Sequence, residues 1–116
     1  MKIRRLVLCT ALLLTACGGT QTSLVVTGRP SASYTGQVAV IMDGATLPSN
    51  FEEVGIVQAI GHGDEADMPH VIEGLRQKAA SLGCDTVIRV KVDQGVTIAS
   101  GTGVAIRTLA ASPAPA

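Results

Sequence analysis

Residues 67–92, DMPHVIEGLRQKAASLGCDTVIRVKV, decide the fold because they encode one helix followed by one strand. Asp67 is a typical N-cap residue, Pro69 falls in the first helical turn, and Gly83 suits a left-handed C-cap. Residues 86–92 alternate between apolar and polar side chains, which indicates a strand with one buried face. Between the caps, apolar residues at helical spacing predict an inward stripe made of Val71, Ile72, Leu75, Ala79 and Leu82.

Further strands are predicted on both sides of this unit. Apolar runs favour strands at 38–42 and 53–60, both before the helix. The turn residues at 93–95 predict a hairpin that leads into a last strand over 96–109. The order β-β-α-β-β predicts a two-layer α+β domain in which one helix packs on a small mixed sheet.

Glycines are expected to interrupt two of these strands. Gly55 indicates a bulge or a close backbone approach, and the Gly101-Thr102-Gly103 run indicates a bulge in the last strand. Residues 61–66 are polar and glycine-rich, and are expected to form a loop before the helix.

The N-terminus has the pattern of a bacterial lipoprotein signal peptide. Three basic residues, Lys2, Arg4 and Arg5, are followed by an apolar run over 6–14 that is too short to cross a bilayer as a helix. The next residues, Leu14-Thr15-Ala16-Cys17, resemble the lipobox. This resemblance implies cleavage before Cys17, a diacylglyceryl thioether on its sulfur and an acyl chain, such as palmitate, on the new amine. Gly18, in place of Asp, favours the outer membrane by the same resemblance, with the domain in the periplasm.

These features divide the chain into four predicted segments. A signal peptide covers 1–16, the lipidated Cys17 and a polar tether cover 17–37, the α+β domain covers 38–108, and a disordered tail rich in alanine and proline covers 109–116. Oligomerisation is one way to stabilise a folded unit this small.

Composition excludes several classes of function. The formal net charge is zero, so there is no electrostatic case for nucleic-acid binding. Aromatic residues make up only 2% of the chain, which leaves no platform for stacking bases or sugars. Of the three cysteines, Cys9 leaves with the signal peptide and Cys17 is acylated. Cys84 is therefore expected to be a lone, buried thiol.

Three motifs resemble a small envelope domain shared by the Rcs stress-sensor lipoproteins and the YbjQ-type proteins labelled as heavy-metal-binding. They are Val54-Gly55-Ile56-Val57, the helix end and strand from Lys78 to Ile88 with its Leu82-Gly83-Cys84-Asp85 junction, and Gly101-Thr102-Gly103-Val104-Ala105-Ile106. The resemblance implies the fold over about residues 50–108. The Rcs sensor carries disulfides that one cysteine does not reproduce, so its signalling does not transfer.

One polar cluster suggests metal chemistry. His62, Asp64 and His70 lie within nine residues, and a loop that folds back would present them to Zn²⁺, Ni²⁺ or Cu²⁺. In the simpler interpretation Asp67 caps the helix, the nearby carboxylates sit favourably at its N-terminus, and both histidines are solvated. Elsewhere, a small basic patch is one interpretation of three residues on the last two strands: Arg89, Lys91 and Arg107.

No catalytic set is recognisable in the sequence. There is no Gly-x-Ser-x-Gly motif, and a whole helix separates Cys84 from His70. We therefore expect a non-enzymatic envelope lipoprotein without a cofactor, whose periplasmic domain is an interaction or stress-sensing module. Its expected partners are the membrane, through Cys17, and an envelope protein. The alternative is a periplasmic metal-binding protein that uses His62, Asp64 and His70.

Overall fold

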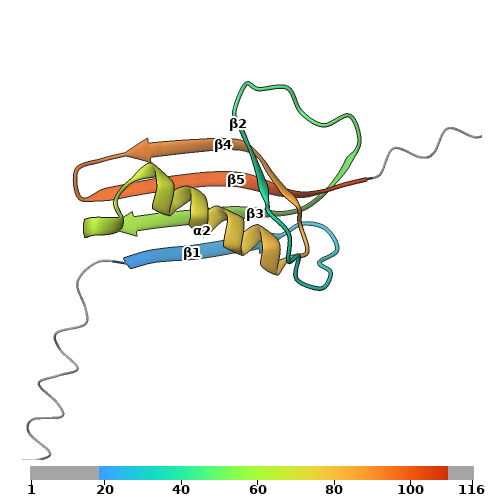
Figure 1. The fold of residues 1–116 in the computed structure, drawn as a ribbon, viewed down its shortest axis with the longest axis horizontal. Helices are drawn as coiled ribbons and strands as arrows, with labels where there is room; N and C mark the ends of the chain where they lie inside the picture. The colour runs from blue at the N-terminus through green and yellow to red at the C-terminus, as the bar shows by residue number, and fades with distance from the viewer. Residues whose placement is uncertain (1–18, 110–116) are drawn as a thin grey trace, which may run out of the picture.

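The computed structural model describes residues 19–109 as one helix packed on a five-stranded mixed sheet (Figure 1). This arrangement confirms the predicted two-layer α+β class. The elements in chain order are β1 (Gly19–Val26), β2 (Ala39–Met42), β3 (Phe51–His62), the short 3-10 helix η2 (Gly63–Glu65), α2 (Met68–Ser81), β4 (Thr86–Gln94) and β5 (Ile98–Thr108).

Helix α2 begins and ends where the sequence predicts. The Asp67 carboxylate accepts a hydrogen bond from the backbone N–H of His70 at 3.0 Å, which satisfies one free donor of the first turn. At the other end Gly83 has φ +80°, a conformation that suits glycine, and its N–H donates to the carbonyl of Ala80 at 3.0 Å. The predicted stripe faces the sheet, with Val71, Leu75 and Ala79 fully buried.

The strands follow the spatial order β1-β3-β5-β4-β2. All neighbouring pairs are antiparallel except β2 and β4, which are parallel. The predicted hairpin joins β4 to β5. β5 is the last of the described strands in sequence and lies at the centre of the sheet, between β3 and β4.

The prediction of a tether over 17–37 is wrong for most of that segment. Residues Gly19–Val26 form β1, which pairs with β3 along its whole length, from Gly19 opposite His62 to Val26 opposite Gly55. The chain then crosses the end of α2, where the N–H of Ser31 donates to Leu82 and that of Tyr34 donates to Ala80. Of the predicted tail only Leu109 is described.

The expected loop over 61–66 is also shorter than predicted. β3 continues through His62, and residues Gly63–Glu65 form a turn of 3-10 helix. Gly61 stays in the strand because its missing side chain leaves room for the backbone of Glu65, which a Cβ would strike.

The bulge near Gly55 is confirmed, but the bulge predicted at Gly101-Thr102-Gly103 is not in β5. Those residues pair in continuous register with β3, and the irregularity lies in β4 between Ile88 and Lys91. There Arg89 has φ +52°, the left-handed region. The two glycines instead give room to the core, since a Cβ on Gly101 would collide with Val71.

The main core lies between the sheet and α2 and contains valine, alanine and leucine side chains from every layer. On the opposite, helix-free face of the sheet, Ile88 and Ile106 are also fully buried. Their place on that face follows from strand alternation, because their neighbours Val87 and Ala105 belong to the main core.

Candidate functional site

The predicted lipidation site, Cys17, lies outside the described residues. The folded domain nevertheless begins close to it in the sequence, since β1 starts at Gly19, two positions later. Any anchor at Cys17 is therefore joined to the folded domain without a long linker. Within residues 19–109 no helix is long and apolar enough to cross a membrane.

The predicted metal residues lie at one end of the sheet but on different elements. His62 is the last residue of β3, Asp64 lies in η2, and His70 lies in the first turn of α2. The Nδ1 atom of His70 is 2.7 Å from the Oδ1 atom of Asp67. Its Nε2 atom is 3.9 Å from the Oε1 atom of Glu65.

These contacts shift the ionisation of both partners. The hydrogen bonds from the backbone and ring of His70 lower the pKa of Asp67 below its ordinary value. The hydrogen bond from Asp67 raises the pKa of His70, and the Glu65 carboxylate adds to this effect. The imidazole therefore tends toward the cationic form, which does not bind metals.

The structure does not bring the predicted metal residues into contact with one another. Among the described residues, no group of three or more His, Cys, Asp or Glu side chains is placed to hold a metal ion. His70 is brought to Asp67 and Glu65, whereas no contact joins it to His62 or Asp64. The capping role predicted for Asp67 is confirmed, but the histidines are not loop residues, since His62 ends β3 and His70 lies in α2.

A polar cleft of about 240 Å³ lies beside His70 and Glu65, between β1 and α2. The hydroxyl of Thr20 donates to the Oε2 atom of Glu65 at 3.1 Å across it. The sequence did not reveal this cleft because one wall is β1, which was expected to be a tether. Its lining is made of Thr20, Thr22, Glu65, His70, Glu73, Gly74 and Gln77.

The helix-free face of the sheet carries a row of apolar side chains across four strands. Val25 of β1 lies opposite Ile56 of β3, Ile56 lies opposite Val104 of β5, and Val104 lies opposite Ile88 of β4. Exposure increases along this apolar row toward the β1 edge. Ile88 is fully buried, whereas Ile56 is 48% exposed and Val25 is 61% exposed.

The apolar row ends at an unprotected sheet edge. β1 has eight residues, GTQTSLVV, without a charge or a proline. Among the described strands none pairs with its outer side. Exposed edges of this kind accept further strands, and proteins commonly block them with charges or prolines. The opposite edge strand, β2, has only four residues and is followed by Asp43, which pairs with Lys91 at 3.6 Å.

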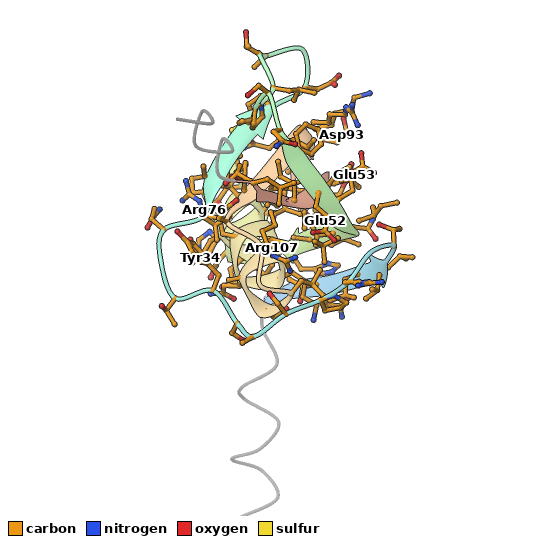
Figure 2. The ribbon with its side chains drawn as sticks, turned by 90° about the vertical axis from the view of Figure 1, so that its right-hand side faces the viewer. Tyr34, Glu52, Glu53, Arg76, Asp93 and Arg107 are labelled. Atoms are coloured by element: carbon orange, nitrogen blue, oxygen red, sulfur yellow. The ribbon has the colours of Figure 1, made fainter. Side chains whose placement is uncertain are left out.

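The three basic residues of β4 and β5 do not form an unpaired basic patch. Arg89 pairs with Glu53 at 3.6 Å, and Arg107 pairs with Glu52 at 3.2 Å. The other pair is Lys91 with Asp43. Figure 2 shows Arg107 and Glu52 beside one another at the end of the sheet.

Arg107 also fastens the segment that precedes β2. Its Nη2 atom donates to the hydroxyl of Ser31 at 2.8 Å and to the carbonyl of Arg29 at 3.2 Å. Its Nε atom donates to the carbonyl of Gly83 at 3.4 Å. One guanidinium thus joins β5, β3, the end of α2 and the chain that comes after β1.

Cys84 is fully buried, as expected. Burial raises the pKa of its thiol to about 11 and outweighs the opposing effect of the Arg107 charge, while Asp85 adds a smaller contribution in the same direction as burial. A thiol in this state is a packing group and a poor nucleophile.

The chain matches no protein-family model, no curated protein and no solved structure. The resemblance to the Rcs-sensor and YbjQ-type domains therefore stays a prediction from the sequence motifs.

Proposed function

We propose that this chain is a non-enzymatic, lipid-anchored envelope protein whose domain binds an extended strand of another envelope protein along β1. The observation that carries the proposal is the apolar row, which becomes steadily more exposed as it approaches the open β1 edge. The lipobox at 14–17 supports the anchor, and outer-membrane placement with a periplasmic domain is part of the proposal.

Strand addition suits this edge for two reasons. The outer backbone groups of β1 offer hydrogen bonds to an added strand, which gives affinity without a deep pocket. An apolar side chain on that strand, placed opposite Val25, would extend the apolar row and cover part of the exposed surface. The polar row next to it contains Ser23 and Gln58, whose side chains bond at 3.3 Å, and would help to set the register.

Site-specific photo-crosslinking in cells tests the proposal. A photoreactive residue at Ser23, on the β1 edge, is expected to capture a protein partner, whereas the same residue at Ser49, in the loop before β3, is not. The mass of the product shows whether the partner is a second copy of this chain or a different envelope protein. The identity of a different partner separates a general adaptor from a stress sensor.

A matched pair of variants makes the test specific to the edge. Val25→Lys places a charge on the β1 edge, and Met42→Lys places one on β2, at residues that are 61% and 40% exposed. We expect Val25→Lys to abolish the Ser23 crosslink and Met42→Lys to leave it unchanged, with both proteins folded. Equal crosslinking from Ser23 in the two variants would contradict docking at β1.

A further inference from the structure

The end of the sheet where β1 begins also carries the turn between β4 and β5 (Figure 1). Gly19 lies opposite His62, and His62 lies opposite Ile98. The N–H of Gly63 donates to the carbonyl of Thr97 at 3.0 Å, which ties the end of β3 to this turn. The first residue of β1 and the β4–β5 turn therefore belong to one rigid surface.

This surface exposes apolar side chains. Val96, in the β4–β5 turn, is 98% exposed, and Ile98 is 50% exposed. The turn has a defined shape, since the N–H of Gly95 donates to the carbonyl of Ile98 at 2.8 Å. Met68, at the start of α2 on the same end, is 43% exposed. Exposed apolar side chains that gather at one place commonly mark a contact with a protein or a membrane, whereas single ones are ordinary.

The proposed anchor brings a lipid surface to this same end. Cys17 precedes Gly19 by two residues, which span at most about 7 Å of extended chain. A lipid attached there would hold the β4–β5 turn close to the headgroups, without the tether that the sequence suggested. No other described end of the sheet lies so near Cys17 in the chain.

We infer that residues 95–98, the β4–β5 turn and the first residue of β5, form a second membrane contact that inserts Val96 and Ile98 into the lipid surface that holds Cys17. The inference rests on the proposed lipid anchor. Charged groups at this end include Asp64, Glu65, Asp67 and Asp93, with His70 beside two of them. Because these carboxylates would be repelled by anionic headgroups, the surface suits zwitterionic lipid.

The lipid anchor at Cys17 and the contact at residues 95–98 would together fix the orientation of the domain on the membrane, whereas the anchor alone would leave the domain free to rotate. The strands would stand on the membrane, with the Arg107 end directed away from it. The β1 edge would then rise from the lipid surface and stay open to the partner strand proposed above.

Labelling of single introduced cysteines tests this contact without background. Cys84 is buried, and the Cys17 sulfur is occupied in the acylated protein. The acylated full chain, in vesicles of phosphatidylcholine and phosphatidylethanolamine, is treated with a cationic, membrane-impermeant maleimide. The variants are Val96→Cys and, as a control at the far end of α2, Tyr34→Cys. Val96 is 98% exposed in the domain and Tyr34 only 38%. Without a membrane contact, Val96→Cys should therefore react faster than Tyr34→Cys, and a membrane contact should reverse this order.

We expect vesicle-bound Val96→Cys to react several-fold more slowly than Tyr34→Cys, the reverse of their exposure in the domain. The positive charge of the reagent makes the test stricter. The carboxylates near the turn attract the reagent, and this attraction alone would speed the reaction of Val96→Cys. Faster reaction of Val96→Cys would overturn the membrane contact and leave the anchor intact. Mass spectrometry of the Cys17 peptide separates the two hypotheses, since an unmodified peptide overturns the anchor and this inference together.

Discussion

Gly101 of β5 lies directly beneath Val71 of α2, and a Cβ at this glycine would collide with the Cγ1 atom of that valine. The same Cβ would be 3.4 Å from the Cδ1 atom of Leu75. The helix therefore rests on bare backbone at this point, and the spacing between the two layers depends on it.

Gly101→Ala is expected to destabilise the domain by about 1–3 kcal/mol, because the added methyl group forces α2 away from the sheet. Thr102→Ala is the matched control, since Thr102 is the next residue and points to the exposed, helix-free face. Urea unfolding followed by circular dichroism measures both. Equal stability of the two variants would show that the helix is free to shift.

Replacement of Arg107 is expected to loosen the segment between β1 and β2. Arg107→Lys loses the fork that joins Glu52, Ser31 and two carbonyl groups, at a cost of about 1–3 kcal/mol. Hydrogen exchange should rise at the backbone N–H of Ser31, which bonds to Leu82. Arg89→Lys is the control, because Arg89 makes one exposed ion pair, and it should change stability by less than about 1 kcal/mol. A similar loss in both variants would argue against the fork.

The start of α2 is expected to be most stable in weakly acidic solution. The pKa of Asp67 is lowered in the folded state, so its stabilisation is complete above the ordinary value of 3.8 and is lost as the pH falls through the lowered pKa. The pKa of His70 is raised, so its contribution is complete below 6.5 and is lost as the pH rises through the raised pKa.

Thermal unfolding across this range tests the pair. We expect the melting temperature of the wild type to fall as the pH rises above 6.5, and that of His70→Gln to lack this fall. His62→Gln, which leaves the His70–Asp67 contact in place, is the control, and an NMR titration should place the pKa of His70 above its ordinary value of 6.5. If His62→Gln alone flattened the profile, the assignment to His70 would be wrong.

Cys84 is expected to behave as an inert part of the core. The native thiol should resist alkylation at about pH 8, because it is buried and its pKa is about 11, and should react at the rate at which the domain opens. Cys84→Ser should cost about 1–3 kcal/mol more than Cys84→Ala if its hydroxyl lacks a partner. Fast alkylation of the folded protein would reveal an accessible thiol.

Helix α2 was predictable because its apolar residues recur at helical spacing between two capping residues. β4 was predictable because its apolar and polar side chains alternate. β1 was missed because the side chains that face α2 there include Thr20 and Thr22, whose methyl groups lie against Gly74. Threonine counts as polar in a sequence, yet its methyl group packs like an apolar one. The signal for a strand in this segment was the apolar end, Leu24 to Val26, preceded by alternating threonines.

The bulge was misplaced for a related reason. Gly101 and Gly103 serve the packing of the core, whereas the real irregularity uses Arg89 in the left-handed region, a conformation that its side chain gives no reason to expect. At the candidate site, the sequence placed His62, Asp64 and His70 near one another along the chain. Only the three-dimensional structure shows that Asp67 and Glu65 are the partners of His70.

The central place of β5 has a consequence for the order of folding. β3 and β4 do not touch along their edges, because β5 fills the gap between them, and β5 is synthesised after the other four described strands. Before residue 98 emerges, the nascent chain lacks the strand that would join its two halves. We therefore expect the described domain to form its complete sheet only after β5 is available, so that a chain cut before residue 98 would stay unfolded.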